Sequence, residues 1–146
     1  MIDPIAYLKQ IEHYNTHINN KLEELAMLWA MVTKITSTIK EDAVSFGGGN
    51  HDKIGEAVSK IVMLEEKINA DIDRYIDSKE SIYAQLEKLQ NPDHITVIYK
   101  KYFKGETWPQ IANDMNMTER NAQIIHGRAL QAFSAILNGK KDKNFR

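Results

Sequence analysis

Four polar side chains whose chemistry suits base recognition stand just after Thr118: Glu119, Arg120, Asn121 and Gln123. In the major groove an arginine can donate to both acceptors of guanine, and asparagine or glutamine can pair with adenine. Glutamate can accept from cytosine. If a helix carries these residues into the groove, its amino-terminal turns reach the base edges. Their types and spacing therefore predict contacts with bases.

A second set of residues is suited to the phosphate backbone. The hydroxyl and amide of Thr118 can donate to a phosphate oxygen, and nearby cations supply the salt-dependent part of binding. The residues that we expect in this role are Thr118, Lys100, Lys101, Lys104 and Arg128. The alternative is an ordinary solvated face, because any small helical unit leaves one polar face in water.

The distribution of charge favours the same end of the chain. Residues 1–90 carry 10 Lys and Arg against 15 Asp and Glu, whereas residues 91–146 carry 9 against 5. The overall net charge of −1 hides this asymmetry. A polyanion is therefore expected to meet the carboxy-terminal part.

Helix signals place the polar residues on the second helix of a helix-turn-helix. Thr107 and Gln110 have the spacing of a capping box, which starts a short helix. Asn116 and Met117 then form the turn, with Met117 plugging the space between the helices. Thr118 caps a recognition helix over about residues 119–137.

A further helix is expected before this pair. Asn91-Pro92 ends the preceding helix, because proline cannot continue the hydrogen-bond ladder. Asp93 can cap the new helix, and Gly105 is placed to stop it in a left-handed conformation. Residues 91–139 are thus predicted to form a three-helix unit, followed by a disordered basic tail at 140–146.

Residues 1–90 carry two long amphipathic patterns, with apolar residues at three- and four-residue steps. The first should begin at Asp3-Pro4 and fray near Thr36–Ile39, and the second should run from about residue 50 to Leu89. Between them, Ser45–Asn50 contains three adjacent glycines, which favour a flexible tip. The run lacks phosphate-loop spacing. We predict an all-α protein with a long antiparallel coiled-coil hairpin, whose thin core favours self-association into a homo-oligomer.

Several classes of function are disfavoured. There is no Cys, and His13 and His17 lack the glutamate that a zinc-protease helix requires, since position 14 is Tyr. We therefore expect no metal, no cofactor and no catalytic residue, and the protein is not expected to be an enzyme. No apolar run approaches the roughly 20 residues that span a bilayer, and the first residues do not resemble a signal peptide. A soluble protein of the bacterial cytoplasm is expected.

The stretch VIYKKYFKGETWPQIANDMNMTERNAQIIHGRALQAF resembles region 4 of bacterial sigma-70 factors. The matching positions are Tyr102, Gly105, Trp108, Ile111, Ala112, Thr118, Ile125, Arg128, Ala129 and Leu130. The whole chain, with KIT at residue 34 and DKIGEAVSKI after the glycines, resembles a family of small prophage-encoded proteins that are generally regarded as phage transcriptional regulators. The resemblance implies an accessory factor of transcription that binds double-stranded DNA, bacterial RNA polymerase, or both.

The chain departs from the sigma pattern on the recognition helix. Sigma factors carry basic residues where Glu119, Asn121 and Gln123 stand, which leaves Arg120 as the only cation in the first two turns. Two other functions stay open. One is an adaptor that binds polymerase or another phage protein, and the other is a DNA-packaging component similar to a small terminase.

Overall fold

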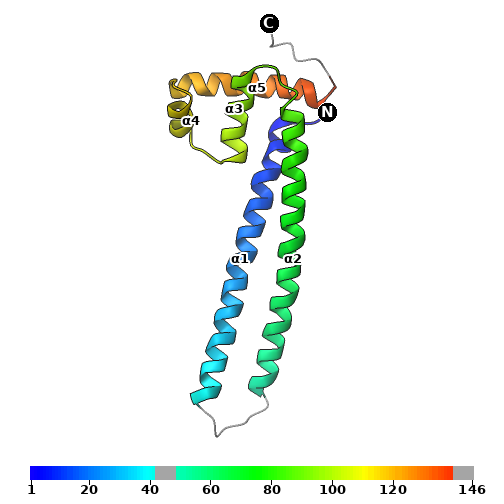
Figure 1. Ribbon diagram of the computed structural model, residues 1–146, viewed down its shortest axis with the longest axis vertical. Coiled ribbons are helices and arrows are strands. Elements are labelled where there is room, and N and C mark those ends of the chain that lie inside the picture. The colour runs from blue at the N-terminus through cyan, green and yellow to red at the C-terminus, as the bar shows by residue number, and fades with distance from the viewer. Residues whose placement is uncertain (42–48, 140–146) are drawn as a thin grey trace. The chain divides into compact units, whose positions relative to one another are not determined.

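The structure is a computed structural model of the chain, and it describes residues 1–41 and 49–139. The expected basic tail and most of the glycine-rich tip lie outside these residues. Every regular element in the described part is helical, as the sequence predicts (Figure 1). The elements are α1 (Pro4–Glu41), α2 (Gly49–Leu86), α3 (Pro92–Ile98), the π-helical segment η1 (Tyr99–Phe103), α4 (Trp108–Asp114) and α5 (Glu119–Leu137).

The long helices α1 and α2 run antiparallel, which confirms the predicted hairpin (Figure 1). Residues 15–74 of this pair form one compact unit. Apolar side chains at heptad spacing close its seam, and the most buried are Ile18, Ala57, Ile61 and Ile68. The seam also holds an ion pair between Lys21 and Asp71, with Asp71 only 8% exposed.

The ends of the long helices differ in part from the expectation. Asp3 caps α1 as predicted, accepting from the amide of Ile5 at 3.1 Å. The helix does not fray near Thr36 but continues to Glu41. The Thr36 and Thr38 hydroxyls donate to the carbonyl oxygens four residues earlier, at 2.8 and 3.0 Å, so both side chains bond to the helix that they belong to. Helix α2 ends at Leu86, three residues before the predicted Leu89.

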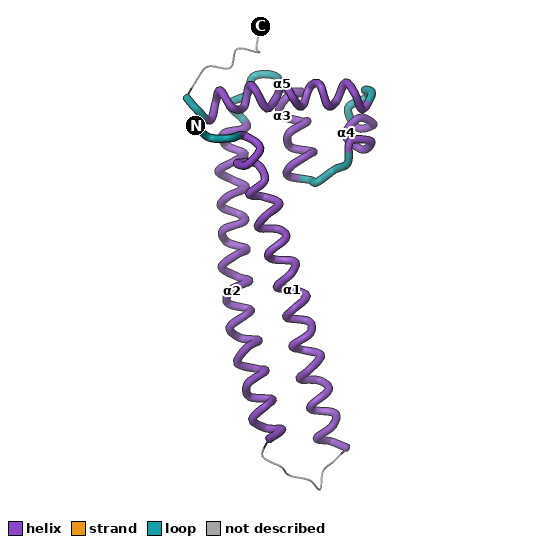
Figure 2. The backbone as a smooth tube through the Cα atoms, turned by 180° about the vertical axis from the view of Figure 1, so that it is seen from behind, coloured by secondary structure: helices purple, strands orange, loops and turns teal. Residues whose placement is uncertain are grey.

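Residues 1–14 and 75–139 belong to the second compact unit. The functional boundary near residue 90 that the sequence predicts stays a prediction. The first turns of α1 and the last turns of α2 share one core with the helices that follow: Leu8, Ile11, Ile82 and Leu86 are buried in the same cluster as Phe133. Within this unit α5 packs on both α3 and α4 (Figure 2).

The third helix starts and ends differently from the sequence expectation. Asn91, not Asp93, is its cap: the Asn91 side chain accepts from the Asp93 amide at 2.9 Å, and Pro92 occupies the first turn. An asparagine directly before a proline is the better placed cap, because proline has no amide to satisfy. The helix then widens into the π-helical segment η1, and Gly105 follows with φ 65° in the predicted left-handed conformation.

The first residues of the chain are tied to the end of α5. The Ile2 amide donates to Asn138 Oδ1 at 2.8 Å, and Asn138 Nδ2 donates to the Ile2 carbonyl at 3.2 Å. Gly139 then adopts φ 75°, which confirms Asn138-Gly139 as the stop of the helix. Within residues 1–41 and 49–139, no helix has the length and apolar character needed to cross a membrane.

Candidate nucleic-acid interface

Helices α4 and α5 form the predicted helix-turn-helix, and each start is fixed by a threonine. The Thr107 amide donates to Gln110 Oε1 at 2.8 Å, and the Gln110 amide donates to Thr107 Oγ1 at 3.4 Å, which completes the capping box. Thr118 Oγ1 accepts from the Asn121 amide at 3.1 Å. Both caps were expected from the sequence.

The turn between these helices depends on Asn116. It has φ 54°, the only positive φ among the non-glycine residues that the structure describes. Asparagine tolerates this left-handed conformation better than most residues. The Met117 amide then donates to the Ala112 carbonyl at 3.0 Å, and the Met117 side chain packs against the core as predicted.

The four base-contact candidates lie together at the exposed start of α5. Glu119, Arg120, Asn121 and Gln123 are all exposed, whereas Ala122 between them is fully buried. Within the described part of the chain, the side chains of Glu119, Arg120 and Gln123 form no hydrogen bond or ion pair. The core therefore holds the backbone of this turn and leaves its polar side chains available to a ligand.

The backbone-contact candidates are placed less uniformly. Lys100 Nζ lies 3.1 Å from Asp114 Oδ2 and 3.6 Å from Glu106 Oε2, and its side chain is 18% exposed. The hydrogen bond to Asp114 raises the pKa of Lys100, and the same bond lowers the pKa of Asp114. The Lys100 charge is thus already compensated, and the residue joins η1 to α4.

The other three cations each have a different contact within the protein. Lys104 is exposed and only 3.8 Å from Glu106, at the outer limit of an ion pair. Lys101 Nζ lies 4.9 Å from the centre of the Trp108 ring, in a cation–π contact. Arg128 is exposed on α5 and has an interaction of its own within the protein.

An aromatic cluster that joins η1, α4 and α5 was not predicted from the sequence. Tyr102 Oη lies 2.9 Å from His126 Nε2, and the Trp108 ring meets the His126 ring edge-on at 5.0 Å. Burial, with a smaller contribution from Lys101, lowers the pKa of His126 and so favours the neutral ring. The tautomer of that ring decides which of the two side chains donates the hydrogen bond. Burial raises the pKa of Tyr102. No local pattern joins residues 24 positions apart.

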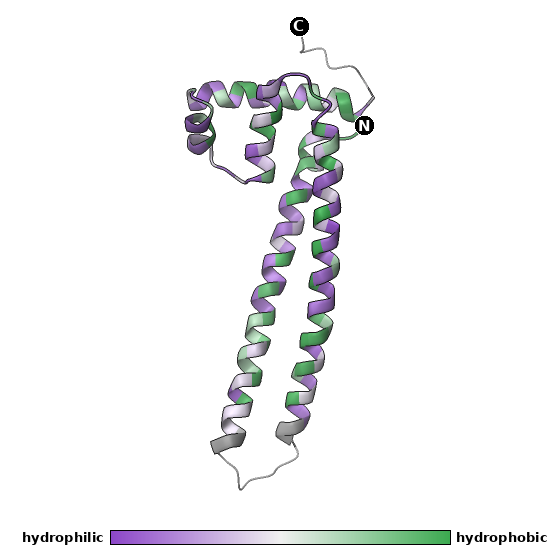
Figure 3. Cartoon of the chain, in the orientation of Figure 1, coloured by the Kyte–Doolittle hydropathy of each residue, from purple (hydrophilic) through white to green (hydrophobic). Residues whose placement is uncertain are grey.

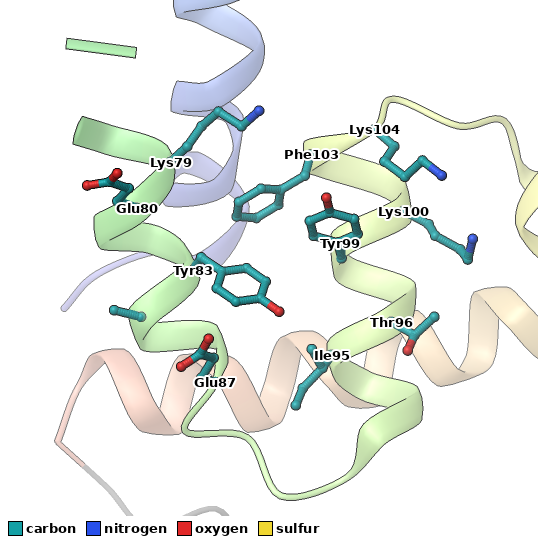
Figure 4. A pocket seen from close by; sticks show the side chains of 11 residues that line it. Lys79, Glu80, Tyr83, Glu87, Ile95, Thr96, Tyr99, Lys100, Phe103 and Lys104 are labelled. Atoms are coloured by element: carbon teal, nitrogen blue, oxygen red, sulfur yellow. The ribbon is translucent and has the colours of Figure 1, made fainter. Parts of the chain in front are cut away.

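An apolar cleft opens between the last turns of α2 and the α3–η1 segment (Figure 4). Its volume is about 710 Å³. Three aromatic rings form its wall: Tyr99 and Phe103 stack at 5.1 Å, and the Tyr83 ring stands edge-on to both at 5.9 Å. Lys79, Lys104 and Glu87 lie at its edges. The sequence shows these residues only as an apolar helix face.

Metal ligands do not gather in the described residues: no three His, Cys, Asp or Glu side chains there are placed to share an ion. His17 instead lies close to Asp71. The hydrogen bond from Lys21 is the main cause of the lowered pKa of Asp71, and the charge of His17 is a small further cause.

Comparison with known proteins identifies a family without assigning an activity. No curated protein and no solved structure matches the chain significantly. The family described as "Protein of unknown function (DUF722)" matches residues 9–134, which include both long helices and the helix-turn-helix. The chain belongs to the DUF722 family.

Proposed function

We propose that the chain binds double-stranded DNA through α5 and regulates phage transcription in the cytoplasm of the bacterial host. The observation that carries the proposal is the exposed start of α5, where Glu119, Arg120 and Gln123 have no partner among the described residues. These side chains provide the donors and acceptors that distinguish bases in the major groove. The resemblance to sigma region 4 supports the same role.

Each residue of this surface has a separate part in the proposal. Arg120 pairs with a guanine, and Asn121 and Gln123 pair with adenines, while Glu119 accepts from a cytosine. The Thr118 oxygen accepts from the Asn121 amide, which leaves the Thr118 hydroxyl proton to donate to a phosphate. Lys101, Lys104 and Arg128 supply phosphate contacts, and Lys100 holds α4 in place through Asp114.

The charge balance predicts that one copy of the chain binds DNA with modest affinity. Residues 91–139 carry 5 Lys and Arg against 4 Asp and Glu. Each phosphate contact contributes a slope of about −0.9 to a plot of log affinity against log salt. The three cations assigned to phosphates therefore set a slope no steeper than about −3 for this unit alone.

The test is fluorescence anisotropy with duplexes from phage regulatory DNA. Arg120→Ala should weaken binding to the best duplex by about 1–3 kcal/mol and relax discrimination at one base pair. Lys104→Ala should weaken all duplexes alike and reduce the salt slope by about 1. Gln131→Ala is the matched control, since Gln131 is exposed on α5 three turns beyond Arg120. Equal affinities of Arg120→Ala and Gln131→Ala for every duplex would reject the assignment.

The aromatic cleft favours a second candidate, an adaptor that binds RNA polymerase. An exposed apolar hollow with aromatic walls and charged edges is typical of a protein-binding surface. In this case Tyr99→Glu should abolish co-sedimentation with purified bacterial RNA polymerase and leave DNA affinity unchanged. Co-sedimentation that is equal for Tyr99→Glu and the parent chain would exclude the cleft as the contact.

A further inference from the structure

One side of the α1–α2 pair in residues 15–74 is almost free of charge. Seam residues recur at alternating steps of three and four along each helix. The residues that directly follow them, such as Leu22 after Lys21 and Ala26 after Leu25, all lie on one side of the helix pair. In an antiparallel pair these positions from both helices face the same way. We call this side the uncharged face; it consists of Asn15, Asn19, Leu22, Ala26, Trp29, Thr33, Thr36, Gly55, Val58, Val62, Glu65, Asn69 and Ile72.

The opposite side of the same pair is strongly charged. Of the 13 positions in the uncharged face, only Glu65 is charged. The 13 equivalent positions on the other side carry 7 charges. They are His17, Asn20, Glu24, Met27, Met31, Lys34, Lys53, Glu56, Lys60, Met63, Lys67, Ala70 and Arg74. Both sides belong to the same two helices, so the difference is not one of general composition.

Large apolar side chains project from the uncharged face. Trp29 is 50% exposed, Leu22 45%, Val62 51% and Val58 42%. Ile72 is half-buried beside them. Leu22 and Trp29 are two turns apart on α1, and Val58 and Ile72 are four turns apart on α2. On each helix they therefore form an apolar stripe directly beside the seam. Figure 3 shows hydrophobic segments alternating with hydrophilic ones along both helices.

The seam by itself buries little. Leu25, Leu28, Val32 and Ile35, the seam residues of α1 beyond the Lys21–Asp71 pair, are all only half-buried. Two helices alone cannot enclose a core, and helices of a four-helix bundle use a third apolar position beside the two seam positions. The uncharged face supplies that third position on both helices.

We propose that the uncharged face is the interface between two copies of this chain, which pack their hairpins face to face as a four-helix arrangement. Depletion of charge with an exposed tryptophan is typical of the buried centre of an interface. A face about 30 Å long and about 20 Å wide follows from 22 residues of helix and two helix diameters. That is comparable with the roughly 800 Å² per partner of a standard stable interface. A second copy fits this face because its own uncharged face has the same length and apolar character.

The proposal does not depend on DNA binding and is tested without DNA. Sedimentation equilibrium of the full chain should show a monomer–dimer equilibrium. Trp29→Lys should raise the dissociation constant at least about tenfold, because it places a charge at the centre of an apolar contact. Met63→Lys is the matched control: Met63 is 57% exposed, on the opposite side of α2. It should leave the dissociation constant unchanged.

A second readout separates loss of association from loss of folding. In a Trp108→Phe background, Trp29 is the only remaining tryptophan, and its emission should shift to the blue as concentration rises. Circular dichroism at 222 nm should show that Trp29→Lys keeps its helical content. A parent chain that stays monomeric up to about 100 µM, or a dimer equally sensitive to Trp29→Lys and Met63→Lys, would overturn the proposal.

Discussion

At the scale of single residues, the contact between Tyr102 and His126 determines how the helix-turn-helix should respond to pH. The two side chains join η1 to α5 at 2.9 Å, and burial lowers the pKa of His126. Neutral imidazole can accept a hydrogen bond from the Tyr102 hydroxyl, whereas imidazolium can only donate one to it. Protonation therefore fixes the direction of this hydrogen bond and places a charge in a partly buried site close to Lys101.

We predict that His126 makes the protein less stable in mild acid. Its pKa in the folded state lies below the unfolded value near 6.5, so its contribution is complete above that value. It is lost as the pH falls from 6.5 through the folded pKa, because the unfolded chain binds a proton that the folded chain does not. His126→Gln should flatten the dependence of the unfolding free energy on pH between 7 and 5. The measurement is urea unfolding at fixed protein concentration.

The control for this prediction is His13→Gln. His13 is exposed on α1 in the same compact unit, away from the Tyr102 contact, so this variant removes a histidine without touching that contact. Tyr102→Phe removes the hydroxyl alone and should cost about 1 kcal/mol at pH 7. A parent curve that is already flat between pH 7 and 5 would show that His126 does not titrate in this window.

At the scale of elements, the Lys21–Asp71 pair should set the register of α1 against α2. Both residues occupy seam positions, and the Asp71 side chain is 11% exposed and also lies 3.4 Å from Arg74. The hydrogen bond from Lys21 is the main cause of the lowered pKa of Asp71. This contribution is present above the ordinary value of 3.8 and is lost as the pH falls below it.

Removing one residue of the Lys21–Asp71 pair should lower the free energy of unfolding more than replacing both residues. Lys21→Leu leaves a buried carboxylate that keeps only the weaker contributions of Arg74 and His17, and it should lower the unfolding free energy by about 1–3 kcal/mol. The double change Lys21→Leu with Asp71→Leu should recover most of that loss, because an apolar pair needs no compensating charge. Urea unfolding of the three variants forms the test. A double variant as unstable as the single one would mean that the pair itself holds the hairpin together.

The elements also show what the sequence could and could not predict. Caps are local, so Asp3, Thr107 and Thr118 and the stops at Gly105 and Gly139 were all predicted correctly from short patterns. Heptad spacing likewise predicted the hairpin. The competition between Asn91 and Asp93 for one cap was misjudged, because both are good caps and only the place of Pro92 decides between them.

Local sequence patterns could not predict contacts between residues that are far apart in the sequence. The widened turn η1 packs Tyr102 and Phe103 against the core, and a periodic apolar face in the sequence does not distinguish it from an ordinary helix. Lys100 looked like a free cation, although its partner Asp114 lies 14 residues away. The base-contact candidates were placed correctly on an exposed turn, since a cap followed by a buried alanine fixes which side of α5 faces outward. Their binding to DNA stays a prediction.

At the scale of the whole molecule, the charge asymmetry predicts that the proposed binding of DNA by one copy is weak. Residues 1–90 are net acidic, and residues 91–139 are close to neutral. Residues 140–146 carry 4 Lys and Arg against a single Asp. Much of the positive charge of the carboxy-terminal part is thus outside the helix-turn-helix. Under the proposed function, this charge would add affinity for any DNA sequence and no discrimination between sequences.

Self-association would supply the affinity that a single copy lacks, and this gives the last prediction. Two helix-turn-helix units joined through the uncharged face would bind a duplex with two sites at the same time. The affinity of such a dimer is typically 10²–10⁴ times that of a single unit for a single site. Trp29→Lys should therefore lose about a hundredfold in affinity for a duplex with two sites and nothing for a short duplex with one. Met63→Lys should lose neither, and Arg120→Ala should weaken both, as anisotropy titrations with the two duplexes would measure. If Trp29→Lys weakened the short duplex to the same extent as the long one, its effect would lie in the folding of the DNA-binding unit and not in the joining of two copies.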